Sequence, residues 1–497
     1  MLNIFNTTVE LSESPIDTAV LPLGSVEPKG PHLPIGLDFM LAEQFAYEFS
    51  KGKAVYLLPV WPLSAAVEAR GFRGVAALVQ QTMWDVLGDL ASALARQGFK
   101  RLVILDFANY NWIVKQRVRE LNLDTKTIQA VWVNPKQFAK ETADKPLGAD
   151  YGGGAIETSV AMALFSSRVR RPFMDFEAGV PREYVDYKGL KTLSGQGHWG
   201  KPSKATPELG GQFYKLMMDK TREYVDWALG LFPGGRPIEE HDAEDIWWPD
   251  GATPGVDSSV DWRSTMGEIT HSPTDLAILP TGAIEQHSAA MPLGTDHFQA
   301  VEISRRVAAE LKAYLLPAIP VVTSWCHMAF RGTLTLRAMT VRRVIEDIAT
   351  SVYASGLRKL AIVNVHGGNW VIKPTVVEMN QARPELAVVS TGDIFAYRGQ
   401  AAVEHLHADE GEGSFIKAFH PKAFKAEKAV DFSPNCTASV FDTVGTGGVS
   451  PEGVWGYPSK ATAEAGQKNA ADHARDAAAY IKKTFADLQS RYPTRAK

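Results

Sequence analysis

An internal repeat constrains the fold of this 497-residue chain more than any other feature of its sequence. Residues 19–38, AVLPLGSVEPKGPHLPIGLD, match residues 277–296, AILPTGAIEQHSAAMPLGTD, without a gap and at a distance of 258 positions (277 minus 19). Four more pairs of blocks follow in the same order, ending with GHWGKPSKATPELG at 197–210 and GVWGYPSKATAEAG at 453–466. The chain is therefore expected to contain two copies of one fold.

The stretch between the two copies, residues 232–259, is rich in Gly, Pro and acidic residues, which is typical of an exposed connector. We place the boundary near residue 245, so that the predicted domains are 1–245 and 246–497. A chain of this length is expected to form two domains in any case.

Each half alternates helical and strand patterns. Residues 360–365, LAIVNV, form a short apolar run typical of a strand buried on both faces, as do residues 277–279. Residues 341–356 carry apolar residues at helical spacing and end at Gly356, and residues 461–492 predict a long amphipathic helix with a counterpart at 205–229. Alternation of this kind predicts an α/β fold, with a mostly parallel sheet between two helical layers in each half.

Composition excludes several classes of protein. The formal net charge of -4 favours neither nucleic acid nor an anionic membrane as a partner, and no apolar run approaches the length of a membrane-spanning helix. The first residues lack the basic start and apolar core of a signal peptide. Only Cys326 and Cys436 occur, which excludes a cysteine-rich zinc site and suits the cytoplasm. We expect a cytoplasmic protein that acts on a small molecule.

Three blocks in the second half supply metal-ligating residue types next to glycines, at or after apolar strands. In each block taken alone, the residues could equally be surface side chains or a hydrogen-bonded strand end. Together they predict a divalent-metal site at the end of a sheet, because carboxylates and imidazoles are ligands for Zn, Mn and Fe alike. The blocks are GAIEQHSAAMPLGTD with Glu285, His287 and Asp296; NVHGGN with His366; and HLHADEGEGS with His407, Asp409, Glu410 and Glu412.

The first half lacks most of these residue types. His287 aligns with Lys29 and His366 with Ala108, while Glu27, Asp38 and Glu157 keep the carboxylate. A protonated lysine cannot ligate a metal. Our hypothesis is that the Lys29 ammonium neutralises Glu27 and Asp38 where a cation would otherwise lie, which would make the first half an inactive, pseudoenzyme domain.

These motifs resemble the creatininase family of metal-dependent amidohydrolases in both halves. The family patterns read approximately G-x-x-E-x-H-G-x-H-L-P-L-x-T-D, then N-x-H-G-G-N, then H-A-G-E-x-E-T-S. This chain departs from them at Ser288, Ala289 and Ala290, where the family has Gly-Pro-His, and at Gly413, where it has Thr. The departures put the family's familiar substrates in doubt.

The resemblance implies one or two divalent ions held by Glu285, His287, Asp296 and His366, with Asp296 as the bridge if two ions bind. Creatininase itself has a further acidic ligand where this chain has Gly368, so Glu410 or Glu412 is expected to replace it. His407 matches a histidine that would shuttle a proton to the leaving nitrogen. Trp325, His327 and Asn369 are candidates for the substrate pocket, although core packing explains Trp325 and His327 equally well.

The leading functional hypothesis is metal-assisted hydrolysis of a C–N bond in a small cyclic amide or formamide. The alternative with the same site is cleavage of a C–C bond in a cyclic diketone, such as an oxidised inositol. A rival from another class is a non-enzymatic binding or assembly protein. Because creatininase-like proteins form hexamers of single domains, the resemblance further implies a homo-oligomer, with three of these two-domain chains in place of six subunits.

Overall fold

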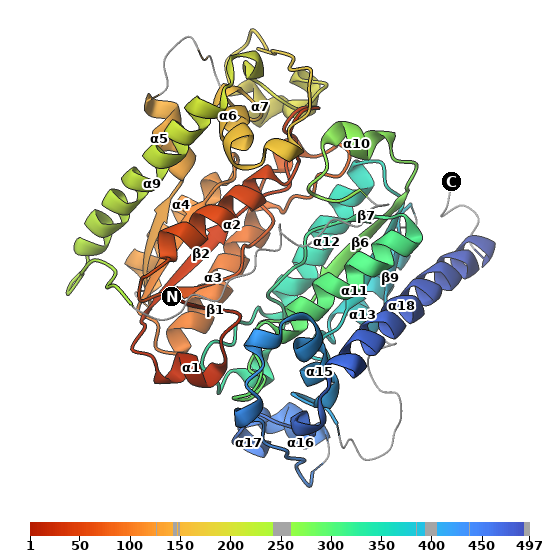
Figure 1. The fold of residues 1–497 in the computed structure, drawn as a ribbon. Coiled ribbons are helices and arrows are strands. Elements are labelled where there is room, and N and C mark those ends of the chain that lie inside the picture. Colours follow the sequence, from red (N-terminus) through yellow and green to blue (C-terminus); the bar gives the residue numbers. More distant parts are fainter. Residues whose placement is uncertain are drawn as a thin grey trace.

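The computed structural model describes residues 1–125, 127–142, 147, 150–241, 260–383, 385–392, 405–436 and 438–491. Two α/β halves lie side by side, with the long helices α9 and α18 on opposite outer flanks (Figure 1). The predicted boundary at residue 245 lies outside the described residues. Among the described helices, none combines the length and the apolar character that crossing a membrane requires.

Each half is built on a parallel sheet, as the buried apolar runs predicted. The strand order is β1-β3-β2-β4-β5 in the first half and β7-β6-β8-β9 in the second. The registers repeat: Thr18 pairs with Arg101 between β2 and β4, and Leu276 with Lys359 between β6 and β8. The strands are β1 (Leu2–Asn3), β2 (Thr18–Leu23), β3 (Tyr56–Leu57), β4 (Arg101–Asp106), β5 (Gln129–Val133), β6 (Leu276–Thr281), β7 (Tyr314–Leu315), β8 (Lys359–Asn364) and β9 (Ala387–Ser390).

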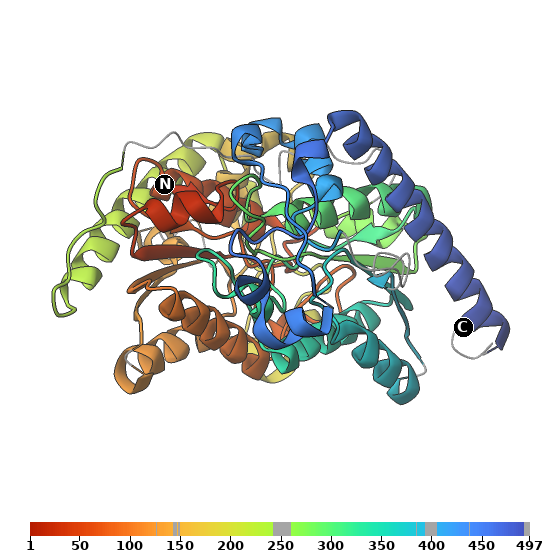
Figure 2. The same cartoon turned by 90° about the horizontal axis from the view of Figure 1, so that it is seen from below.

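Helices cover both faces of each sheet, which gives the expected three layers (Figure 2). The first half contains α1 (Thr8–Glu13), α2 (Leu37–Ser50), α3 (Gln80–Arg96), α4 (Trp112–Glu120), α5 (Pro135–Thr142), α6 (Ala155–Leu164), α7 (Tyr184–Lys188), α8 (Leu190–Leu193) and α9 (Pro207–Gly230). The second contains α10 (Met266–His271), α11 (Thr295–Leu311), α12 (Ala338–Ala354), α13 (Ile372–Ala382), α15 (Glu410–Phe419), α16 (Ala438–Val444), α17 (Thr446–Val449) and α18 (Ala463–Arg491). The helices predicted over 341–356 and 461–492 are confirmed as α12 and α18, and Gly356 has the left-handed φ of a helix-ending glycine, +91°.

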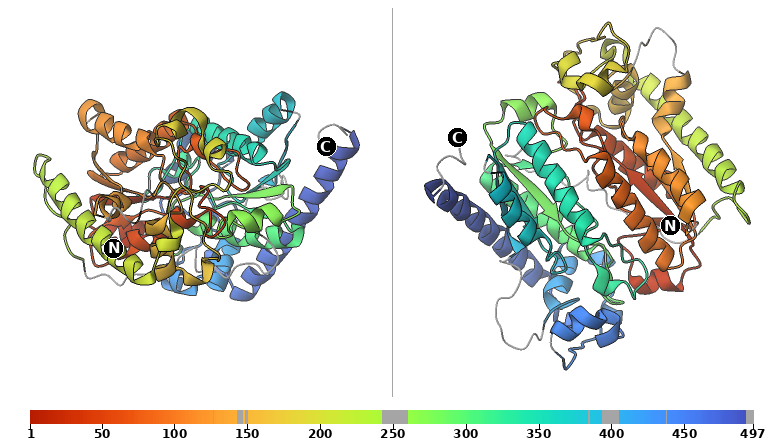
Figure 3. Two further views of the ribbon diagram at one scale, coloured as in Figure 1. Left: turned by 90° about the horizontal axis from the view of Figure 1, so that it is seen from above. Right: turned by 180° about the vertical axis from the view of Figure 1, so that it is seen from behind.

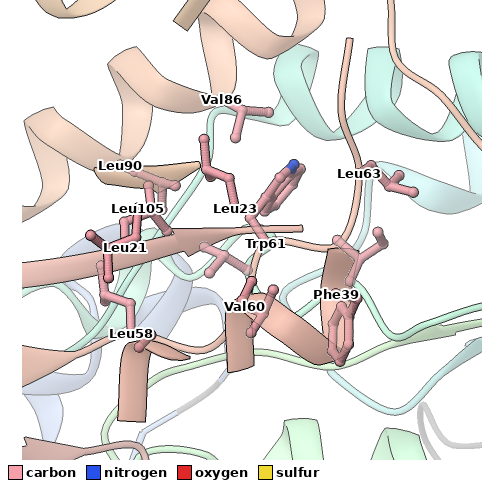
Figure 4. Close-up of a cluster of buried hydrophobic side chains, with 14 of the residues drawn as sticks. Leu21, Leu23, Phe39, Leu58, Val60, Trp61, Leu63, Val86, Leu90 and Leu105 are labelled. Carbon is pink, nitrogen blue, oxygen red and sulfur yellow. The ribbon is translucent and has the colours of Figure 1, made fainter. Parts of the chain in front are cut away.

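One hydrophobic cluster runs through both halves, from Leu21 and Leu23 of β2 to Leu279 of β6 and Ile362 of β8. Figure 4 shows a part of it in the first half, where Leu105 of β4, Val86 of α3 and Trp61 lie close to the β2 side chains. The two repeats therefore share a core, instead of touching only at polar surfaces.

The contacts between the halves are reciprocal. The Tyr56 hydroxyl donates to the Gly332 carbonyl (3.0 Å), and its counterpart Tyr314, 258 positions later, donates to the Gly74 carbonyl (2.8 Å). Helices α3 and α12 run side by side across the junction (Figure 3). Reciprocal contacts of this kind are those of a two-fold dimer, here formed within one chain.

Candidate metal centre

The sheet of the second half brings the predicted ligand blocks together. Strands β6 and β8 are parallel neighbours, so the loop after Thr281 and the loop after Asn364 leave the same edge of the sheet. Gly282 allows the first loop to return to its own helix, because a Cβ at this position would lie only 2.6 Å from the Asp296 carbonyl oxygen. As a result, Glu285 and Asp296 lie beside His366.

Glu285, Asp296 and His366 form the first of three groups whose ligand atoms all lie within 4.8 Å of one another. His366 Nδ1 lies 3.0 Å from Asp296 Oδ2, and His366 Nε2 lies 3.3 Å from Glu285 Oε2. The Thr323 carbonyl, 2.8 Å from His366 Nε2, accepts the proton of that nitrogen, which leaves the Nδ1 lone pair directed at the cluster.

His287, Asp296 and Glu412 form the second group. His287 Nε2 lies 3.4 Å from Asp296 Oδ1 and 3.6 Å from Glu412 Oε1. His287 Nδ1 donates to the Glu285 carbonyl at 3.0 Å, so Nε2 carries the free lone pair. Asp296 therefore presents one oxygen to each group, which is the arrangement that a carboxylate bridging two ions needs.

His407 and His327 approach the other carboxylate oxygen of Glu285, Oε1. His407 joins Glu285 and His287 in the third group, with Nδ1 3.7 Å from Glu285 Oε1, while Nε2 donates to the Gln286 carbonyl at 2.7 Å. His327 Nε2 approaches Glu285 Oε1 to 3.2 Å, so this residue contacts a proposed ligand as well as the pocket. Its ring lies 4.3 Å from the His407 ring, centroid to centroid.

The residues present fit a divalent cation. In the described part of the chain, neither carboxylate oxygen of Glu285 has a hydrogen-bond partner, nor does His287 Nε2, and all three atoms are buried. Buried polar atoms are nearly always hydrogen-bonded, and a bound cation would account for lone pairs left unused in this way. The carboxylates of Glu285, Asp296 and Glu412 converge here on the imidazoles of His287, His366 and His407.

The electrostatics show the same need for positive charge. Burial, opposed by His366, raises the pKa of Glu285 to about 7. Burial acts to lower the pKa of His287, but Glu412 and Asp296 outweigh it and raise that pKa well above its usual value. Burial and the neighbouring His287 lower the pKa of His407 to about 4.

An open cleft leads to this cluster, and all three predicted pocket residues line it. Trp325 is 46% exposed, and the Arg96 guanidinium of the first half lies 5.6 Å from its ring centroid. Asn369 is buried and donates to Asn364 Oδ1 at 2.7 Å, so its side chain supports the His366 loop. Trp370, which the sequence analysis did not single out, also lines the cleft and is 67% exposed.

Of the two alternatives for the third block, the structure places Glu412 at the cluster and Glu410 away from it. Glu410 contacts His405 Nδ1 at 2.9 Å instead. Positions two apart on a helix point about 200° apart, so only one of the two side chains can face the cluster. Asp409 accepts hydrogen bonds from the N–H groups of Gly411 and Glu412 and thus caps α15.

Gln286 is a site residue that the sequence analysis missed. Its side-chain nitrogen lies 3.1 Å from His327 Nδ1 and 2.9 Å from His407 Nε2, and Thr446 Oγ1 lies 2.9 Å from the same His327 nitrogen. Its place between Glu285 and His287 was the available signal. Thr446 and Thr323 had none, because they reach the cluster only through folding.

In the first half, two ammonium groups occupy the corresponding place. Lys29 Nζ lies 2.8 Å from Asp38, 3.1 Å from Glu157 and 3.9 Å from Glu27, as the hypothesis of internal neutralisation required. Lys136, which was not predicted, lies 2.8 Å from both Asp38 and Glu157. Burial acts to lower the pKa of Lys29, but Asp38 and Glu157 outweigh it and raise that pKa well above its usual value.

The chain on either side of the ligands also differs between the halves. Tyr110, at the position that corresponds to Gly368, is part of a buried hydrophobic cluster in the first half. In the second half, a Cβ on Gly368 would lie 2.4 Å from His366 Nε2, so an acidic side chain would clash with the histidine at this position. Ser288 and Ala408, which follow His287 and His407, have left-handed φ angles of +65° and +51°, whereas the first half has Gly30 and Gly153. Non-glycine residues in this conformation are strained and cluster at functional sites.

Comparison with known proteins gives one family for both halves. The family model described as "Creatininase: Creatinine amidohydrolase" matches residues 6–225 and 262–481. A mycofactocin precursor peptide peptidase of Mycobacterium ulcerans is 27% identical over 216 residues, covering 41% of this chain and 83% of that protein. A 3-dehydro-scyllo-inosose hydrolase of Thermotoga maritima is 25% identical over 252 residues, covering 44% and 79%. A creatinine amidohydrolase of Pseudomonas putida is 23% identical over 181 residues, covering 32% and 69%.

Similar solved structures include one described as "Putative creatinine amidohydrolase from Bacteroides fragilis", with 24% identity, a TM-score of 0.40, and coverage of 46% of this chain and 96% of that one. A structure described as "Creatininase Mn" has 21% identity and a TM-score of 0.39, and covers 47% and 99%.

Proposed function

The chain belongs to the creatininase family, whose model matches both of its halves, and on that premise we propose that its second half is a metal-dependent hydrolase. The observation that carries the proposal is the set of buried, unpartnered ligand atoms on Glu285 and His287. The proposed ligands are Glu285, His287, Asp296, His366 and Glu412. Two ions are proposed, since Asp296 turns one oxygen to each ligand group, and the ligand types suit Zn, Mn or Fe.

A divalent cation held by these ligands would lower the pKa of a bound water molecule to about 7, and it would also polarise the substrate carbonyl. The protein residues orient the ligands and move the proton. The carbonyls of Glu285 and Thr323 fix the tautomers of His287 and His366. His407 donates from Nε2 to the Gln286 carbonyl, so its Nδ1 is available to take a proton and pass it to the leaving group.

The proposed substrate is a small cyclic amide or formamide, whose C–N bond is cleaved. Support comes from two relatives that are, by name, a creatinine amidohydrolase and a peptide peptidase. The second candidate is cleavage of a C–C bond in a cyclic diketone of the inositol type, favoured by the similarity to a hydrolase of 3-dehydro-scyllo-inosose.

The test is metal content per chain, measured by elemental analysis on the wild-type protein and two variants. We expect two ions in the wild type, at most one in Glu285→Ala, which lacks a ligand of the first group, and two in Glu27→Ala, because Glu27 is the matched position in the lysine-filled half. If the wild type binds no metal after incubation with Zn, Mn or Fe, the proposal fails and a binding or assembly protein becomes the leading hypothesis. If the wild type does bind metal, turnover of cyclic amides against cyclic diketones separates the two substrate classes.

A further inference from the structure

The first residues of the chain lie against the ligand loop of the second half. The Leu293 N–H donates to the Asn6 carbonyl at 2.9 Å, and the Gly294 N–H donates to the Ile4 carbonyl at 2.8 Å. The Leu293 carbonyl in turn accepts the Glu285 N–H at 3.0 Å. The turn between the proposed ligands is thus held by backbone groups that belong to the other half of the molecule.

These N-terminal residues are themselves well fixed. Asn6 Oδ1 accepts the Asn3 N–H and Asn3 Oδ1 accepts the Phe5 N–H, both at 2.9 Å, and both asparagines are buried. The Phe5 ring stacks on Phe298 at a centroid distance of 4.7 Å. Phe298 lies two positions after Asp296 in the first turn of α11, so this stack packs against the end of the helix that carries a proposed ligand.

The first half has the equivalent contact, related to this one by the internal two-fold symmetry. The Gly36 N–H donates to the Trp262 carbonyl at 2.8 Å, and the Ile35 N–H donates to the Ser264 carbonyl at 3.1 Å. The Trp262 ring packs on Phe39 at 4.6 Å. In that half the loop carries Lys29, whose ammonium pairs with Asp38 and Glu157. The contact there is therefore expected to contribute to stability and not to metal binding.

We propose that the N-terminal segment (residues 3–6) is a positioning element for the metal-ligand loop, so that the first half completes the site of the second. This inference rests on the proposed metal site. Ligands must be held to within about 0.5 Å to bind a metal tightly, and the outer contacts that hold them commonly contribute 10–100-fold in affinity. The half without metal-binding histidines thereby has a role in binding at the other half.

The test uses the full-length chain and metal affinity measured by competition with a chelator. Phe5→Ala is expected to weaken metal binding by about tenfold, and the conservative Phe5→Leu is expected to restore most of the affinity. Trp262→Ala, which removes the ring that packs on Phe39 of the first half, is the control and is expected to lower the thermal midpoint while leaving the metal affinity unchanged. Equal affinity of Phe5→Ala and the wild type would overturn the inference, as would equal weakening by Phe5→Ala and Trp262→Ala.

Amide hydrogen exchange of the peptide containing Leu293 and Gly294 tests the same contact without metal. We expect faster exchange in Phe5→Ala than in the wild type and an unchanged rate in Trp262→Ala. An unchanged rate in Phe5→Ala would show that the N-terminal segment does not hold the loop. A wild type that binds no metal would instead overturn the proposed function, whatever the exchange result.

Discussion

The two halves place three carboxylates on the same backbone frame, but they differ in the groups that surround this negative charge. The first half supplies two internal ammonium groups, and the second surrounds the carboxylates with imidazoles. Even the minor contacts recur, since the Glu157 carboxylate accepts the Gly153 N–H and the Glu412 carboxylate accepts the Ala408 N–H, both at 2.7 Å. The comparison teaches that the same frame carries its positive charge on lysines in the first half, whereas under the proposed function a bound cation supplies it in the second.

The largest expected effect comes from giving the second half the lysine of the first. In His287→Lys, the ammonium should pair with Asp296 and Glu412, as Lys29 pairs with Asp38 and Glu157. We expect retained secondary structure by circular dichroism, loss of bound metal by elemental analysis, and a fall in kcat/KM of about 10³-fold, equivalent to several kcal/mol of transition-state stabilisation. Stoichiometric metal in this variant would break the comparison.

Removing the internal charge should unfold the first half more easily. Lys29→Met removes the ammonium that pairs with Asp38 and Glu157 and leaves Lys136 beside them, and breaking a buried ion pair costs about 3–5 kcal/mol. Urea denaturation measures the loss. Lys215→Met, which removes an exposed ammonium paired with Asp219, is the control and should change stability by less than about 0.5 kcal/mol. Equal effects of the two substitutions would contradict internal neutralisation.

A pH-dependent difference is expected at Asp106, where the second half has Asn364. Burial raises the pKa of Asp106 to about 7, against about 4 in an unfolded chain. The folded state therefore holds a proton that the unfolded state has lost between these values, and stability falls by about 1.4 kcal/mol per unit as pH rises through that range.

Asp106→Asn should remove this part of the pH dependence. The measurement is urea unfolding at pH 5 and pH 7.5, with the wild type and the variant compared at each pH. If stability changes by the same amount between the two pH values in both proteins, Asp106 is not protonated in the folded state.

The smallest expected effect concerns the strained residue after His287. Ser288→Gly should raise the free energy of unfolding by up to about 1 kcal/mol, because glycine adopts the φ of +65° without strain. The reverse change, Gly30→Ser, should be destabilising, since a Cβ there would lie 2.8 Å from His32 Nδ1. Thermal midpoints of both variants check the opposite signs, and a shift in the same direction would refute the strain argument.

The repeat, the parallel sheets and the three ligand blocks could be predicted because each depends on residues close together in the sequence. Strand β6 and helix α12 follow from local apolar periodicity, and Glu285, His287 and Asp296 follow from one short motif. Lys136 escaped prediction because its position carries no motif and gains meaning only when α5 packs beside Asp38.

The sequence by itself determined that the chain holds two creatininase-like units, and that one copy has His287 and His366 where the other has Lys29 and Ala108. Only the tertiary structure decided that Glu412 faces the cluster in place of Glu410, that His327 approaches Glu285, and that the carbonyls of Ile4 and Asn6 accept hydrogen bonds from the loop before Asp296. The physical reason is that residue types and short-range spacing are written in the chain, whereas the direction of a side chain on a helix and the contacts between distant segments arise from packing.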